Sequence, residues 1–153
     1  MIKFNKYTLG VPLDNMHYKI DLDINPKPAD IDILQQGLND YNADKLNERP
    51  QEFVIYLRDD QGTIHGGITA LEFSDSIHIA LLWVDEPLRS KGYGSLLLEA
   101  AEDVAIKRKL QFAYVDTFGF QGGDFYPKQG YELIGRVEFA LLGHARLFFR
   151  KNL

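Results

Sequence analysis

The stretch that decides the fold runs from residue 82 to residue 98 and reads Leu82-Trp83-Val84-Asp85-Glu86-Pro87-Leu88-Arg89-Ser90-Lys91-Gly92-Tyr93-Gly94-Ser95-Leu96-Leu97-Leu98. The pattern predicts a strand that ends at Val84, then a glycine loop, then the start of a helix. A helix N-terminus leaves about four backbone N–H groups without partners and carries partial positive charge, so it attracts phosphate. Gly92 and Gly94 have no Cβ atom that would hold a phosphate away. Arg89 and Lys91 add positive charge at the rim, so the stretch predicts a compact pyrophosphate site.

Other phosphate-binding loops fit this stretch less well. A dinucleotide fingerprint requires a third glycine three residues after Gly94, where this chain has Leu97, and no Walker lysine motif occurs in the sequence. A glycine turn that merely starts a helix remains an alternative, and so does an unrelated nucleotide-phosphate binder.

The pattern Arg-x-x-Gly-x-Gly, from Arg89 to Gly94, resembles motif A of the GNAT superfamily of N-acetyltransferases, which holds the coenzyme A pyrophosphate. A second run, Phe125-Tyr126-Pro127-Lys128-Gln129-Gly130-Tyr131-Glu132, resembles motif B of the same family. The resemblance implies one α/β (α+β) domain over residues 1–153, with a mixed, mostly antiparallel central sheet of about six to seven strands flanked by helices. It also implies that acetyl-CoA is the cosubstrate. The cofactor-binding residues implied are Leu82, Trp83, Val84, Arg89, Ser90, Lys91, Gly92, Tyr93, Gly94, Ser95, Gln121 and Lys128.

The mechanism that the resemblance implies is direct attack of an acceptor's primary amine on the acetyl thioester, in a ternary complex. The acceptor is a small molecule or a peptide. No acyl-enzyme is needed, and the absence of cysteine and of a Gly-x-Ser-x-Gly motif agrees with that. A backbone N–H near Val84 is expected to polarise the thioester carbonyl.

Tyr126 is the predicted catalytic residue. By its position in motif B it is the general acid, because a hydroxyl with an ordinary pKa of about 10 can protonate the departing thiolate. A buried packing tyrosine is the alternative, and Pro127 is expected to end the short helix at Tyr126. The general base stays open between Glu72, His78 and a water chain. A second functional interpretation is a non-catalytic acyl-CoA-binding sensor or scaffold with the same fold.

The composition restricts the partners and the compartment. The chain of 153 residues carries a formal charge of −5, which argues against a nucleic-acid or membrane partner. No metal is expected, because neither metal-ligand spacing nor a paired carboxylate cluster appears. No apolar stretch approaches the ~18 residues of a membrane span, and the N-terminus lacks an apolar signal region, so a cytoplasmic protein is expected.

Outside the two motifs, local patterns predict the remaining elements. Residues 1–17 are interpreted as an N-terminal arm or edge strand, and the alternation in residues 18–24 predicts a strand. Asp30 is expected to cap a helix that ends before Pro50. Strands are predicted at 53–57, 63–73, 77–84, 112–117, 131–140 and 146–150, the second of them interrupted by a glycine pair, and a short helix within 121–129. A homodimer is expected because large apolar side chains crowd the C-terminal strands: Phe139, Leu141, Leu142, Leu147, Phe148 and Phe149.

Overall fold

The computed structural model describes residues 20–153, which fall into two compact units that divide between Asn47 and Glu48. The interpretation of residues 1–17 as an arm or edge strand lies outside the described residues. Among residues 20–153, no helix combines the length and the apolar character needed to cross a membrane.

The first unit contains one helix, α1 (Pro28–Leu46), among its described residues. It begins two residues earlier than expected, because Pro28 stands at the first helical position, where its missing N–H and fixed φ are tolerated. Lys27 precedes it without a side-chain cap, so the predicted Asp30 cap is wrong. Asp30 instead lies in the first turn, where a carboxylate favours the positive end of the helix.

Residues 20–24 form no strand, so that part of the predicted strand 18–24 is wrong. Ile20, Leu22 and Ile24 are more than half exposed, and Asp23 accepts a hydrogen bond from the Asn25 backbone N–H at 2.9 Å, which turns the chain. Alternating side chains fix which face of a strand would be buried. They do not supply a neighbouring strand for its backbone groups.

The second unit is a six-stranded sheet in the order β1-β2-β3-β4-β6-β5. Its strands are β1 (Gln51–Arg58), β2 (Ile64–Phe73), β3 (Ser76–Val84), β4 (Phe112–Phe118), β5 (Glu132–Leu141) and β6 (His144–Asn152). All neighbouring pairs are antiparallel except β3 and β4, which are parallel and joined by the long helix α2 (Tyr93–Lys107). The α/β (α+β) class and the mixed, mostly antiparallel sheet are thus confirmed.

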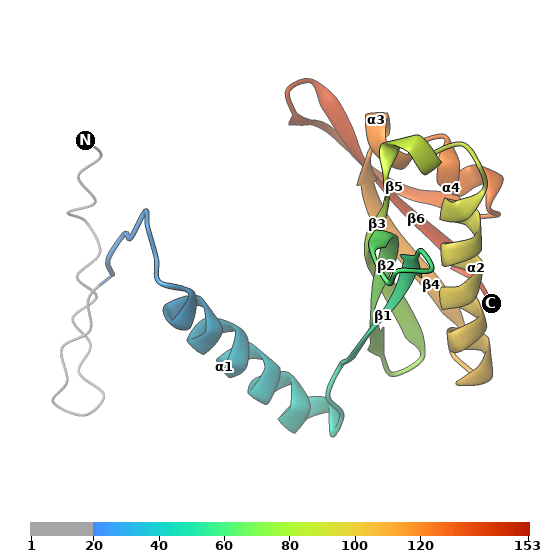
Figure 1. The fold of residues 1–153 in the computed structure, drawn as a ribbon. Coiled ribbons are helices and arrows are strands. Elements are labelled where there is room, and N and C mark those ends of the chain that lie inside the picture. The colour runs from blue at the N-terminus through green and yellow to red at the C-terminus, as the bar shows by residue number, and fades with distance from the viewer. Residues whose placement is uncertain (1–19) are drawn as a thin grey trace, which may run out of the picture. The chain divides into compact units, whose positions relative to one another are not determined.

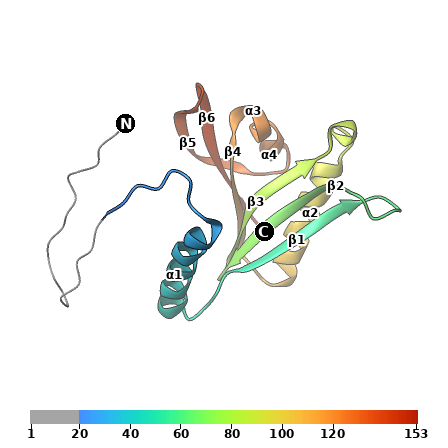
Figure 2. The ribbon, with the colours of Figure 1, turned by 60° about the vertical axis from the view of Figure 1, so that its left-hand side comes forward.

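Helix α2 covers one face of the sheet (Figures 1 and 2). Its buried side chains recur at helical spacing and pack on the inward side chains of the strands, as the apolar pattern predicts. The buried set is Leu97, Leu98, Ala101, Glu102 and Ala105. The strands contribute Ile68, Ala70, Ile77, Ile79, Ala113, Val115, Leu147 and Phe149.

Two details of the predicted elements are corrected. The β2 strand continues through Gly66 and Gly67 without interruption. Glycine suits both positions, because a Cβ at either would lie within 3 Å of a carbonyl oxygen of a neighbouring strand. The expected single helix within 121–129 is two short helices, α3 (Gly119–Gly122) and α4 (Phe125–Lys128). Pro127 lies inside the first turn of α4, where its missing N–H costs nothing, so the helix does not end at Tyr126.

Candidate active site

A gap between β3 and β4 forms the site. The two strands pair only from Ser76 to Ile79 on β3 and from Phe112 to Val115 on β4, although both continue beyond these residues. The register between β2 and β3 shifts at Thr69/Ala70, close to the residue where β3 leaves β4. A cavity of about 920 Å³ occupies the gap and extends to the N-terminus of α2.

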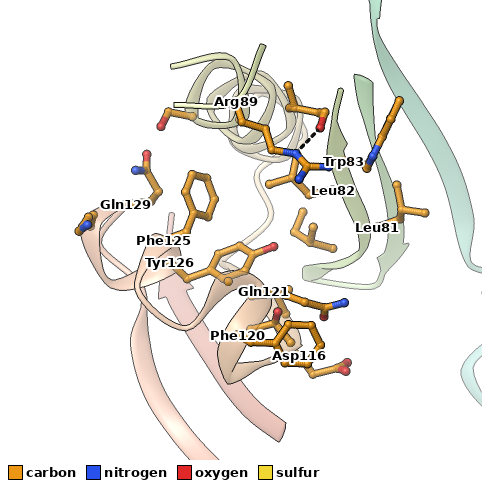
Figure 3. A pocket seen from close by; sticks show the side chains of 18 of the residues that line it. Leu81, Leu82, Trp83, Arg89, Asp116, Phe120, Gln121, Phe125, Tyr126 and Gln129 are labelled. Carbon is orange, nitrogen blue, oxygen red and sulfur yellow. Dashed lines mark hydrogen bonds between the residues drawn. The ribbon is translucent and has the colours of Figure 1, made fainter. Parts of the chain in front are cut away.

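The backbone of β3 presents unpaired groups to this gap. Asp85 donates its N–H to the His65 carbonyl at 2.8 Å, and N–H directions alternate along an antiparallel strand. The N–H groups of Leu82 and Val84 therefore point away from β2, toward the side where β4 has separated. On the same side the Val84 carbonyl accepts a hydrogen bond from Arg89 Nε at 3.0 Å (Figure 3).

The loop between β3 and α2 leads the chain into the helix with an open N-terminus. Asp85 accepts a hydrogen bond from the Glu86 N–H at 2.9 Å and begins a short 3-10 turn, η1 (Glu86–Leu88). Gly92, directly before α2, has φ +89°, a left-handed conformation that suits glycine. A Cβ on Gly92 would meet no protein atom within 4 Å, so the space above the helix N-terminus is free for a ligand.

Helices α3 and α4 form the opposite wall. Gln121 lines the cavity from α3, and its Oε1 lies 3.4 Å from the Phe118 N–H. Phe125, Tyr126 and Lys128 line it from α4. The Cβ position of Gly94, on α2, lies 3.5 Å from the Phe125 ring of α4, an ordinary van der Waals contact.

Tyr126 is 5% exposed, and its ring packs against the rings of Phe125, Tyr131 and Phe149. Figure 3 shows its hydroxyl directed into the cavity, toward Leu82. Burial, with a smaller contribution from the charge of Asp116, raises the pKa of Tyr126 to about 12. The hydroxyl is therefore a neutral hydrogen-bond donor throughout the neutral pH range.

The predicted cofactor-binding residues and Tyr126 meet around this one cavity, except for Lys91 and Tyr93, which do not line it. Those that do are Leu82, Trp83, Val84, Arg89, Ser90, Gly92, Gly94, Ser95, Gln121, Tyr126 and Lys128. Tyr93 lines a smaller neighbouring pocket together with His65 and Asp85.

Neither side chain considered as general base lines the cavity. Glu72 is ion-paired with Arg108, at the end of β2 far from Val84 in the register. His78 is separated from the cavity by Asp116, whose Oδ1 lies 3.3 Å from the His78 Nε2. Asp116 itself lines the cavity and was missed from the sequence, because only the divergence of β4 from β3 exposes it there. Among residues 20–153, no group of three or more His, Asp and Glu side chains is placed to hold a metal ion.

Comparison with known proteins identifies the family. The family model described as "Acetyltransferase (GNAT) family" matches residues 18–131. An acetyltransferase of Agrobacterium fabrum is 30% identical over 105 residues, which cover 68% of this chain and 77% of that protein. The blasticidin-S acetyltransferase of Streptomyces morookaense is 31% identical over 97 residues, 60% of this chain and 69% of its own. The chain therefore belongs to the acetyltransferase (GNAT) family.

Solved structures share the fold. The crystal structure of an acetyltransferase from Bacillus cereus is 32% identical, with a TM-score of 0.72, and the match covers 87% of this chain and 98% of that one. A Bacillus anthracis protein in complex with acetyl coenzyme A has a TM-score of 0.59 at 18% identity, with 69% of this chain and 65% of its own covered. At that identity the second likeness concerns the fold alone.

Proposed function

We propose that this acetyltransferase moves the acetyl group from acetyl-CoA to a primary amine of a small molecule, by direct attack in a ternary complex. The observation that carries the proposal is the gap between β3 and β4. It connects an open helix N-terminus, suited to phosphate, with two unpaired backbone N–H groups and a buried tyrosine hydroxyl. GNAT acetyltransferases use acetyl-CoA, and one protein of this fold has been solved with it bound.

The cofactor pyrophosphate is assigned to the N-terminus of α2. Backbone N–H groups of the first turn have no intrahelical partners, and Gly92 and Gly94 leave room beside them. Arg89 and Lys128 line the same cavity and add positive charge. The pantetheine arm is assigned to the gap itself, where Gln121 supplies a side-chain amide.

Leu82 and Val84 are the residues whose backbone N–H groups are free to polarise the thioester carbonyl. A backbone donor fixed in a strand needs no reorganisation as negative charge develops on the oxygen, which is why such donors accelerate acyl transfer. Leu82 is the better placed of the two, because Tyr126 directs its hydroxyl toward it (Figure 3).

Tyr126 is proposed as the general acid. The amine nitrogen attacks the thioester carbon, the C–S bond breaks, and the departing thiolate takes the phenolic proton. A proton released by the amine then restores the phenol. The raised pKa of Tyr126 keeps the proton in place until the thiolate forms.

The preference for a small-molecule acceptor has one support among the relatives. The blasticidin-S acetyltransferase, 31% identical over 97 residues, is named for a small-molecule substrate. A peptide amine is the alternative acceptor, and a non-catalytic acyl-CoA-binding module is the alternative function.

The proposed function is tested by two measurements on the full chain. Calorimetry with acetyl-CoA is expected to show binding, and a thiol-release assay against a panel of small amines and short peptides is expected to show turnover with a small amine. Binding without turnover of any panel member would favour the sensor or scaffold interpretation. Tighter binding of a nucleotide than of acetyl-CoA would contradict the assignment of the cavity.

We also propose a homodimer formed through the β5–β6 hairpin. Strand β5 is an edge of the sheet, and Phe139 and Leu142 near the tip of the hairpin are 81% and 94% exposed. Leu147 and Phe149, which were expected to contribute to this surface, belong to the domain's own core.

Light scattering across micromolar concentrations is expected to give the mass of two chains. Phe139→Asn is expected to shift the equilibrium toward the monomer, because asparagine tolerates the positive φ of this position but removes the ring. A monomeric wild-type protein over the whole range would defeat the proposed dimer.

A further inference from the structure

Arg89 and Asp116, two charged side chains of opposite sign, line opposite ends of the cavity (Figure 3). Among the described lining residues, the cations are Arg89 and Lys128, and Asp116 is the one acidic side chain. Figure 3 shows Arg89 at one end of the cavity and Asp116 at the other, with Tyr126 between them. One end of the cavity thus suits an anion, and the opposite end holds a negative charge.

Asp116 lies on the sheet face opposite α2. Its neighbours along β4, Val115 and Thr117, are buried on the α2 side, and side chains alternate along a strand. The same alternation, carried through the register with β2, places Leu81 and Trp83 of β3 on the face of Asp116. The cavity therefore passes through the sheet, from the phosphate end beside α2 to an end lined by a carboxylate and apolar side chains.

The carboxylate of Asp116 is held in place by two side chains that do not line the cavity. Oδ2 accepts hydrogen bonds from Arg146 Nε, at 2.6 Å, and from Arg146 Nη2. Oδ1 lies 3.3 Å from Nε2 of His78, whose ring stacks on Tyr114. A carboxylate has about four lone-pair sites, so these three contacts leave room on Oδ1 for one further donor. The Arg146 side chain is about half exposed, and its guanidinium group lies over the ring of Phe118.

The negative charge of Asp116 affects the pKa of a side chain that lines the cavity. It contributes, after burial, to raising the pKa of Tyr126 and of Tyr114. The Gln121 side chain, which lies near Asp116 in Figure 3, is a neutral amide. Phe120, which is about half exposed, provides aromatic surface beside the carboxylate, whereas Trp83 lies nearer Arg89 (Figure 3).

We infer that Asp116 is the acceptor-binding residue and that the acceptor is a cationic primary amine, carrying an apolar or aromatic group that packs against Leu81 and Phe120. The inference rests on the proposed function and specifies its substrate class. An ammonium group donates charge-assisted hydrogen bonds to a carboxylate, and aromatic surface nearby stabilises the cation further. An acceptor held at Asp116 reaches the gap from the end opposite the phosphates. Its ammonium group has no lone pair, so it first releases one proton to solvent; the neutral amine then attacks the thioester carbon, and its second proton restores the Tyr126 phenol.

The test uses phenethylamine as the acceptor probe and Asp116→Asn as the variant, with saturating acetyl-CoA. Asparagine keeps the shape and can still accept from Arg146, but it removes the charge. We expect KM for phenethylamine to rise about tenfold to thirtyfold, within the range of charged hydrogen bonds. The Kd for acetyl-CoA and the inhibition constant of phenethyl alcohol, which has the same ring and chain without the charge, are expected to stay the same.

Arg146→Gln is the matched control, because it removes the partner of Asp116 and keeps the carboxylate. KM for phenethylamine is expected to stay unchanged or to fall. An equal rise of KM in Asp116→Asn and Arg146→Gln would overturn the inference, because the effect would then come from the ion pair between β4 and β6. Equal weakening of phenethylamine and phenethyl alcohol would overturn it as well, since shape and not charge would be lost.

The wild-type protein alone gives a second readout, which also decides if Asp116→Asn does not fold. Phenethylamine is expected to be acetylated in clear preference to aniline, whose nitrogen is uncharged at neutral pH. Equal use of both amines, or acetyl-CoA binding with no turnover of phenethylamine, would overturn the cationic acceptor and leave the cofactor assignment intact. Failure to bind acetyl-CoA would instead contradict the proposed function itself.

Discussion

Replacement of Tyr126 by phenylalanine is expected to lower kcat about 100-fold at neutral pH, in line with typical contributions of general acids. The ring of Tyr126 packs against Phe125, Tyr131 and Phe149, and phenylalanine preserves that packing. Only the hydroxyl, which points into the cavity, is lost (Figure 3). Affinity for acetyl-CoA, measured by calorimetry, is therefore expected to stay close to the wild-type value.

Tyr131→Phe is the matched control. Tyr131 is 3% exposed and lies edge to face with Tyr126, but it does not line the cavity. The same chemical change one ring away is expected to leave kcat within about twofold, because no hydroxyl is removed from the reacting centre. Loss of kcat in both variants would show that the tyrosine cluster acts through packing. Full activity of Tyr126→Phe would contradict the role of Tyr126 as general acid, because water would then have to protonate the thiolate.

The pH dependence follows from the raised pKa of Tyr126. An acid is active in its protonated form, so its contribution is complete below its pKa and is lost as the pH rises through it. With a pKa of about 12, Tyr126 keeps its proton across the neutral and mildly alkaline range. A fall of kcat with the ordinary tyrosine pKa of about 10 that is abolished in Tyr126→Phe would contradict the raised pKa of Tyr126, although not its role as the acid.

Gly92→Val is expected to weaken acetyl-CoA binding about 100-fold, which corresponds to about 2.7 kcal/mol. The Cβ position of Gly92 points into space that no protein atom occupies within 4 Å, directly before the N-terminus of α2. A branched side chain there would fill the volume assigned to a phosphate oxygen. Valine also disfavours the φ of +89° at this position, so the loop that carries Arg89 is expected to shift in the variant. Calorimetry measures the affinity, and thermal unfolding measures the cost to the fold.

Gly62→Val separates these two effects. Gly62 has φ +84° in the turn between β1 and β2, and its Cβ would also meet nothing within 4 Å, but it does not line the cavity. Both variants are expected to lower the Tm by similar amounts, and only Gly92→Val to lower the affinity. A folded Gly92→Val protein with wild-type affinity would remove the helix N-terminus from the assignment of the pyrophosphate.

The parts of the fold that depend on neighbouring residues in the chain were predictable. The strand before Val84, the glycine loop and the start of α2 follow one another within 17 residues, and each has its own local signal. The β1–β2–β3 meander is equally local, because each turn joins strands that pair with each other. Residues 20–24 show the limit of this reasoning, since their alternation was clear and the structure gives them no strand.

By itself the sequence determined that residues 82–98 place a helix N-terminus and two glycines after a strand, because those features depend on local backbone preference and on the absence of a Cβ. Only the tertiary structure decided that β4 leaves β3 after Ile79, and that the gap brings Leu82, Tyr126 and Asp116 around one cavity. The physical reason is that strand pairing and its interruption depend on contacts between segments more than 30 residues apart, such as Ile79 and Val115. No pattern in either segment reveals where two strands stop pairing, so Asp116 became visible as a site residue only in the folded chain.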